Sequence, residues 1–192
     1  MARSSRAQSI LNAVALVGWT GVIGALLVNW PSASLDANSK LLRAVQILEG
    51  ICLYEVGQIV VGVAKGNWIL GVCLHLSRVV VSFLVFPAVP ATLSTKLSLL
   101  AWCITEICRY PMFLLPSSKL ARTARYLAPL LTFPLGAFSE AVSCYASLPL
   151  IEAPLKYLPG FIAPYNCIGF FLGYQQMAKK ALQELKPASS KK

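Results

Sequence analysis

The sequence has few charged residues, and acidic residues are the scarcest of them. Only 12% of its 192 residues are charged, with seven Asp or Glu against 17 Lys or Arg, whereas soluble domains average about 25%. The six cysteines include no Cys-x-x-Cys pair, and His75 is the single histidine. This pattern indicates neither a zinc site nor a disulfide framework. We predict buried, apolar roles for the cysteines and a helix–helix contact for His75.

Long apolar stretches dominate the rest of the chain, since 57% of the residues are hydrophobic. A helix needs roughly 20 apolar residues to cross a bilayer. Six stretches come close to this length, and they are residues 10–30, 42–64, 68–89, 97–115, 127–148 and 158–177. The sequence therefore predicts an all-α polytopic membrane protein with six transmembrane helices. We expect a basic flank at 1–9, one six-span domain at 10–178 and a basic tail at 179–192.

The basic residues are unevenly distributed over the loops of this six-span topology. One side receives eleven of them, namely Arg3, Arg6, Lys65, Lys119, Arg122, Arg125, Lys179, Lys180, Lys186, Lys191 and Lys192. The other side receives four, namely Lys40, Arg43, Lys96 and Lys156. The positive-inside rule then places both termini on the cytosolic side, or on the matrix side in a mitochondrion. The positive charge is explained by topology, so nucleic acid is not an expected partner.

The two ends of the chain do not decide in which cellular membrane the protein resides. Residues 1–9 are basic, rich in serine and free of acids, which fits either a mitochondrial presequence or the cytosolic flank of the first span. The chain ends in Lys191-Lys192, and this position differs from that of a dilysine retrieval signal. We therefore keep two locations, the endoplasmic reticulum and the mitochondrial inner membrane.

Several polar residues lie inside the predicted spans. Glu55 and Gln58 are three residues apart in the second span, so they share one face of a helix. Arg78 lies in the third span. Glu106 and Arg109 are three apart in the fourth span, where they can neutralise one another. We interpret these residues as supports of an internal polar site.

Glu140 in the fifth span is the strongest functional signal, because an ionisable group at membrane depth is expensive and by default marks a functional site. Phe133 precedes it by seven residues, on the same helical face and about 10 Å away along the axis. Gly136 lies between them and leaves space for a ligand or a neighbouring helix. No cation lies three or four residues from Glu140, so we expect its counter-charge from Arg78 or Arg109.

These segments resemble the 3-hydroxyacyl-CoA dehydratase family of very-long-chain fatty acid elongation, also described as protein-tyrosine-phosphatase-like. The matching stretches are residues 54–62, 76–78, 102–114, 125–126 and 133–149. The resemblance implies six spans and removal of water from a (3R)-3-hydroxyacyl-CoA to give a trans-2-enoyl-CoA. It also implies no metal or redox cofactor, a long-chain acyl-CoA substrate, the endoplasmic reticulum membrane and other elongation enzymes as partners.

The resemblance also implies residue roles. In the family, a Tyr and a Glu seven residues apart perform the catalysis, which assigns Glu140 the role of base. The tyrosine position is Phe133 here, which has no proton to donate, and losing a general acid typically costs about 10²–10⁴ in rate. Arg78 and Arg109 match family arginines that hold the site or the thioester end. Gln58 stands where many members have histidine.

Tyrosines elsewhere in the chain are candidate substitutes for the missing acid. We consider Tyr126, Tyr110 and Tyr54. Tyr126 lies on the same face as Phe133, two turns away, if the helix continues across Pro129.

Two functions therefore stay open. The chain is either a dehydratase with a relocated or missing acid, or an inactive member serving as a structural subunit of a larger membrane complex. A transporter is disfavoured because the short chain shows no repeat. A phosphatase is excluded because no cysteine lies in a Gly-rich phosphate-binding loop.

Overall fold

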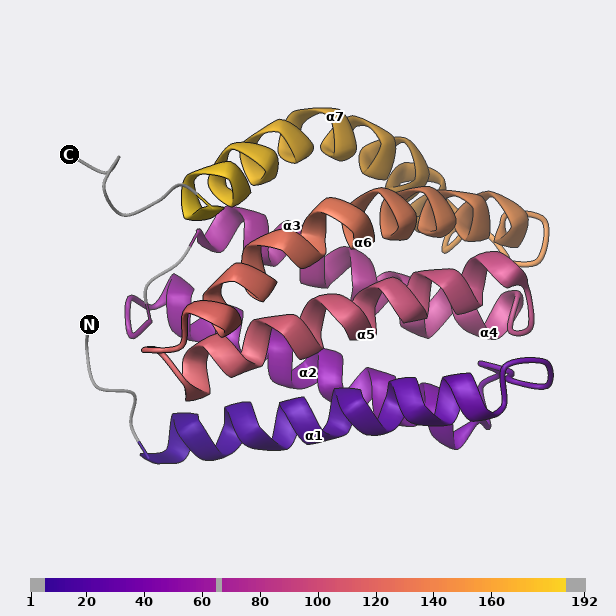
Figure 1. The fold of residues 1–192 in the computed structure, drawn as a ribbon. Coiled ribbons are helices and arrows are strands. Elements are labelled where there is room, and N and C mark those ends of the chain that lie inside the picture. Colours follow the sequence, from indigo (N-terminus) through magenta and orange to yellow (C-terminus); the bar gives the residue numbers. More distant parts are fainter. Residues whose placement is uncertain (1–5, 65–66, 186–192) are drawn as a thin grey trace.

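The computed structural model describes residues 6–64 and 67–185, and these residues contain helices and no strand. The elements are α1 (Arg6–Val28), α2 (Lys40–Val60), α3 (Trp68–Val80), the π-helix η1 (Val81–Val85), α4 (Phe86–Ala88), α5 (Leu93–Leu114), α6 (Lys119–Ser147) and α7 (Tyr157–Leu185). Because α3, η1 and α4 follow one another without a break, they form a single rod. The described residues thus fold into six rods (Figure 1). The prediction of an all-α fold is confirmed.

The rods run alternately up and down the bundle. The most extensive contacts join α5 to α6 and α6 to α7, while α1 packs on α5 and α2 packs on α3. The start of α1 and the end of α7 lie at the same end of the bundle (Figure 1). The side of the membrane that this end faces stays a prediction from the charges. Residues 1–5, 65–66 and 186–192, which include parts of the predicted basic flank and tail, lie outside the described residues.

Within the part of the chain that the structure describes, four helical segments are long and apolar enough to cross a membrane, and they are Arg6–Val28, Trp68–Ala88, Leu93–Leu114 and Lys119–Ser147. The other two predicted spans fall in α2 and α7, which are helices of 21 and 29 residues but are not among these four. In α2 the two glutamates Glu49 and Glu55 lower the apolar character. The helical form of all six predicted spans is therefore present, and membrane crossing by α2 and α7 stays a prediction.

Polar side chains begin four of the helices. Ser39, Asn67, Thr92 and Ser118 each accept a hydrogen bond from the backbone N–H three residues later, which satisfies one of the free donors of a helix start. Helix α6 begins at Lys119, eight residues before the predicted start of the fifth span, and continues through Pro129. Helix α7 likewise continues past residue 178 to Leu185.

Small and hydroxylated residues join α5 to α6 along their length. A Cβ on Gly136 would lie 3.4 Å from the Cβ of Ala101, so the two helices approach closely here. Hydroxyl pairs bridge the helices, among them Ser98–Ser139 (3.1 Å), Ser94–Ser143 (2.9 Å) and Thr105–Thr132 (2.7 Å). Such contacts are typical of helix pairs in membranes. They fix the rotation of α6 and so decide where Glu140 points.

Lys96 provides a test of this fold. Its ammonium group is buried and donates to the carbonyl oxygens of Trp30 (2.8 Å) and Pro31 (3.2 Å), which follow α1. Hydrogen bonds to charged groups contribute about 1.5–3 kcal/mol each. We expect Lys96→Ala to lower the melting temperature of the purified protein in detergent by several degrees. Lys40→Ala, at an exposed position, is the control, and equal melting of both variants would contradict this role.

Candidate functional site

Glu140 is buried, with 5% of its surface exposed, and is held by two other helices. Its Oε1 accepts the indole N–H of Trp102 from α5 at 2.5 Å, and its Oε2 accepts the amide N–H of Asn166 from α7 at 2.9 Å. Among the described residues no cation forms an ion pair with Glu140. The direct counter-charge expected from Arg78 or Arg109 is therefore replaced by two neutral donors, one for each oxygen.

Trp102 connects Glu140 to the charged part of the core. Its ring stacks on Phe86 with centroids 5.1 Å apart, and the Arg78 guanidinium carbon lies 5.1 Å from its centroid. Sequence reasoning did not single out Trp102 or Asn166. Both carried a usable signal, because an indole or amide N–H inside an apolar span needs a hydrogen-bond acceptor.

A chain of ion pairs lies beside Trp102, with Glu106 at its centre. Glu106 Oε1 lies 2.8 Å from Arg78 Nη1, and Glu106 Oε2 lies 2.9 Å from Arg109 Nε. Arg109 Nη2 is also 2.7 Å from Glu55 Oε2. The sequence predicted the pairing of Glu106 with Arg109, but the tertiary structure adds Arg78 from α3 and Glu55 from α2. Together these contacts connect α2, α3 and α5.

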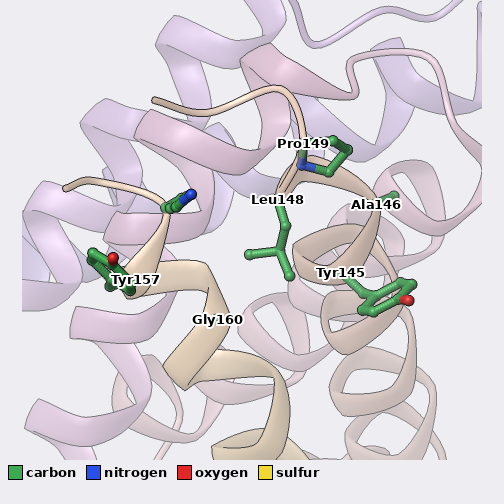
Figure 2. Close-up of a pocket in the computed structure, with 7 residues that line it drawn as sticks. Tyr145, Ala146, Leu148, Pro149, Tyr157 and Gly160 are labelled. Carbon is green, nitrogen blue, oxygen red and sulfur yellow. The ribbon is translucent and has the colours of Figure 1, made fainter. Parts of the chain in front are cut away.

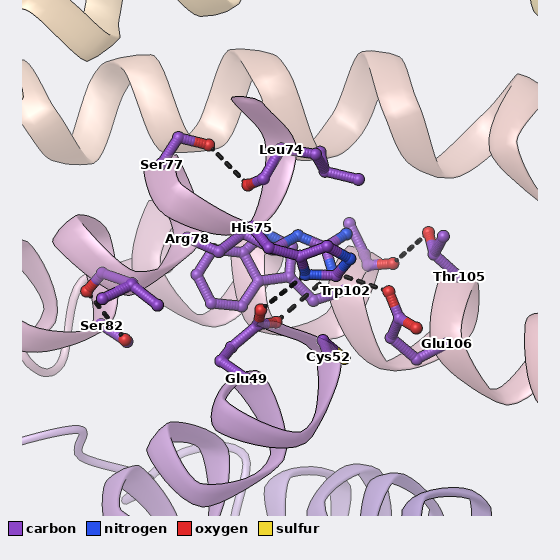
Figure 3. Close-up of polar contacts among 12 residues, drawn as sticks. Glu49, Cys52, Leu74, His75, Ser77, Arg78, Ser82, Trp102, Thr105 and Glu106 are labelled. Carbon is purple, nitrogen blue, oxygen red and sulfur yellow. Dashed lines mark hydrogen bonds and ion pairs between the residues drawn. The ribbon is translucent and has the colours of Figure 1, made fainter. Parts of the chain in front are cut away.

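Glu49 and His75 extend this chain (Figure 3). His75 Nδ1 lies 2.9 Å from one oxygen of Glu49, and Arg78 donates to the other at 3.4 Å. Arg109 Nη1 lies 3.4 Å from His75 Nε2. A guanidinium group can only donate, so Nε2 accepts from Arg109, and the Nδ1–H of His75 donates to Glu49. His75 thus makes the predicted helix–helix contact. Glu49 was missed, although it lies in the same span as Glu55.

Three side chains of metal-binding type meet in this network. Atoms of Glu49, Cys52 and His75 lie within 4.8 Å of one another. Cys52 Sγ is also 3.5 Å from both Tyr110 Oη and Arg109 Nη2, so these atoms already have hydrogen-bond partners. The adjacent guanidinium groups would also repel a cation. We therefore assign this group to the hydrogen-bond network.

Phe133 and Gly136 face different neighbours. The Phe133 ring packs on α7, with its Cζ 3.7 Å from the position of a Cβ on Gly173. Gly136 instead faces Ala101 on α5, so the space it leaves is used by a neighbouring helix. Glu140 contacts both of these helices. Phe133 and Glu140 therefore both reach the interface between α6 and α7, which we call the α6·α7 seam.

The candidate substitute acids lie elsewhere. Tyr54 is 59% exposed on the outside of α2, whereas the Tyr110 ring is fully buried and its hydroxyl lies 2.6 Å from Arg109 Nη2. Tyr126 is half-buried on α6. It lies 14 residues from Glu140 in the sequence, which is about 21 Å along the helix axis. Gln58 is half-buried near the end of α2. None of these side chains has a described contact with Glu140.

A hollow of about 740 Å³ lies between the end of α6 and the start of α7 (Figure 2). Its lining residues are Tyr145, Ala146, Leu148, Pro149, Lys156, Tyr157 and Gly160. The lining begins five residues beyond Glu140 on α6, so the hollow adjoins the same seam.

The charge network predicts that replacing Glu106 strongly lowers the stability of the fold. In Glu106→Gln, Arg78 and Arg109 lose their shared negative partner inside the bundle, and breaking a buried ion pair costs about 3–5 kcal/mol. We expect a markedly lower melting temperature in detergent. Glu152→Gln, at an exposed position in the loop before α7, is the matched control. A Glu106→Gln protein that melts like the control would show that the network does not stabilise the fold.

Comparison with known proteins identifies the family. The family model described as "Protein tyrosine phosphatase-like protein, PTPLA" matches residues 50–186. The proteins named very-long-chain (3R)-3-hydroxyacyl-CoA dehydratase 2 from Mus musculus and Homo sapiens are each 26% identical over 168 residues, with 82% of this chain covered. The chain spans 65% of the length of these relatives, and no solved structure matches it. Because the family match covers more than half of the sequence, this chain belongs to the protein tyrosine phosphatase-like PTPLA family.

Proposed function

We propose that this chain is a membrane-bound (3R)-3-hydroxyacyl-CoA dehydratase with Glu140 as its catalytic base. The observation that carries the proposal is the contact set of Glu140, a buried carboxylate held by Trp102 and Asn166 and without an ion pair to any described residue. The names of the relatives support the same reaction class.

Dehydration requires a base for the C2 proton beside the thioester and an acid for the departing C3 hydroxyl. A carboxylate that is paired with an arginine is a weak base, because protonation breaks the ion pair. Glu106, Glu49 and Glu55 are all paired in this way with Arg78 or Arg109. Glu140 is instead held by neutral donors, so its basic oxygens are kept in position and stay available for the substrate proton.

The polar residues around Glu140 have supporting roles in this proposal. Arg78 orients Trp102 by lying over its ring, while Glu106, Arg109 and Glu55 hold the three helices behind it. Gly136 permits the close approach of α5 that brings Trp102 to Glu140. Because both arginines are already bound by carboxylates, we assign them to holding the site and not to holding the thioester.

We further propose a multi-pass location in the endoplasmic reticulum membrane, with a long-chain acyl-CoA as substrate and elongation enzymes as partners. The apolar helices and the dehydratase relatives support this location. The comparisons give no support to the mitochondrial alternative.

One observation favours the second candidate function, an inactive family member that serves as a structural subunit. The resemblance assigns Phe133 to the position of the family's tyrosine, and the Phe133 ring packs on Gly173. A phenyl ring cannot protonate a leaving hydroxyl, so this position by itself supplies no acid.

Turnover of a long-chain (3R)-3-hydroxyacyl-CoA by the purified protein tests the proposal. We expect Glu140→Gln to lower kcat by about 10²–10⁴, because an amide cannot accept the C2 proton. Glu152→Gln is the matched control and should leave kcat unchanged. Formation of the enoyl thioester, followed by its absorbance, is the measurement.

Two results would favour the structural subunit instead. One is a native protein without turnover that stays inactive when Phe133→Tyr restores the family's hydroxyl. The other is turnover that Glu140→Gln leaves intact, which would remove the proposed base.

A further inference from the structure

The two helices that form the α6·α7 seam lie side by side and antiparallel (Figure 1). Asn166 on α7 contacts Glu140, and Gly173 on α7 lies against Phe133. Phe133 and Glu140 are seven residues apart on α6, and Asn166 and Gly173 are seven apart on α7. The helices therefore keep the same register over two turns, and a residue next to Gly173 lies at the level of Phe133.

Tyr174 occupies that position. It is half-buried, and its hydroxyl donates to the backbone oxygen of Leu130 on α6 at 3.3 Å. Leu130 is three residues before Phe133, which is less than one helical turn. Helix α7 thus brings a phenol to the level at which α6 carries only a phenyl ring.

The acceptor of this hydrogen bond is available for a specific reason. In a regular helix the oxygen of Leu130 would accept from the N–H of residue 134, but Pro134 has no N–H. Tyr174 contacts the oxygen that this proline leaves free. The distance of 3.3 Å is long for an O–H···O bond, which is typically about 2.7–2.8 Å. This contact places the phenol of Tyr174 against α6.

The other hydroxyls near this level point elsewhere. Thr132 is buried and pairs with Thr105 on α5 at 2.7 Å, so its hydroxyl faces away from the seam. Tyr165, next to Asn166, lies nearer the level of Glu140; its ring stacks on Phe161 of its own helix with centroids 6.1 Å apart, and its hydroxyl hydrogen-bonds Cys73 on α3. Among these hydroxyls, that of Tyr174 is the one that reaches α6 from α7 beside Phe133.

We propose that Tyr174 is the general acid of this chain, supplying from α7 the proton that Phe133 cannot supply from α6. The inference rests on the proposed dehydratase function. Tyr174 is eight residues from Asn166, about 12 Å along α7, and Asn166 contacts Glu140. This axial separation of acid and base is close to the roughly 10 Å between positions 133 and 140 on α6.

The reaction then balances with these two groups. Glu140 takes the proton from C2, and the electron pair of the broken C2–H bond forms the C2=C3 double bond. The C3–O bond breaks, and the leaving hydroxyl takes the phenolic proton of Tyr174 and departs as water. Transfer of the proton on Glu140 to the Tyr174 phenolate through water restores both groups.

A four-protein comparison tests this assignment, using the full chain in detergent and a long-chain (3R)-3-hydroxyacyl-CoA. The proteins are the native chain, Tyr174→Phe, Phe133→Tyr and the double variant. We expect Tyr174→Phe to lower kcat by about 10²-fold or more with little change in KM. The double variant should recover most of that loss, because it returns a phenol to the seam from α6. Tyr165→Phe makes the same substitution nine residues earlier, on the opposite face of α7. It is the control and should leave kcat unchanged.

Melting temperatures separate catalysis from structure. Tyr174→Phe leaves the Leu130 oxygen without its donor, and Phe133→Tyr has no reason to restore that bond. Recovery of kcat in the double variant without recovery of the melting temperature is therefore the signature of a catalytic phenol.

Two outcomes would overturn the assignment, and they differ in what else they exclude. An active native protein whose kcat is unchanged in Tyr174→Phe, or not recovered in the double variant, excludes Tyr174 as the acid while Glu140 stays the base. A native protein with no turnover excludes Tyr174 as a working acid, and it excludes the dehydratase function as well when Phe133→Tyr is also inactive.

Discussion

The position of Glu140 depends on the pairing of Glu106 with two arginines behind it. An unpaired charge inside an apolar bundle is expensive, so Arg78 and Arg109 must both reach Glu106 from α3 and α5. This requirement places the Arg78 guanidinium over the ring of Trp102. The ring in turn directs its N–H to Glu140. The ion pairs thus act on the site indirectly, by setting where one neutral donor points.

The structure separates its buried carboxylates into two kinds. Glu49, Glu55 and Glu106 contact guanidinium groups, and these contacts connect α2, α3 and α5. Glu140 contacts only neutral donors among its described hydrogen bonds, and these come from α5 and α7. A group that must gain and lose a proton belongs to the second kind, because each transfer leaves the ion pairs of the bundle intact. In the proposed function, the same apolar environment therefore holds carboxylates with structural roles and, in Glu140, one with a chemical role.

The α6·α7 seam shows how a substitution on one helix can be matched by its neighbour. Phe133 has no hydroxyl on α6, while the proposed acid Tyr174 presents one from α7 at about the same level. Pro134 contributes to this arrangement, because it frees the carbonyl that Tyr174 contacts. The resemblance to the family, followed along the sequence, indicates the missing hydroxyl at position 133. The gain lies 41 residues later in the sequence and is visible only across the interface.

The sequence by itself determined the features that depend on neighbours in the chain. Apolar stretches predicted the helices, the spacing of three predicted the Glu106–Arg109 pair, and the depth of Glu140 marked it as functional. Only the tertiary structure decided which side chains meet, because helix register and rotation result from many weak contacts between helices. It turned Tyr54 outward, gave Glu140 the neutral partners Trp102 and Asn166, and placed Tyr174 beside Phe133. Periodicity along one helix carries no information on its neighbour's register, so these contacts could not be derived from it.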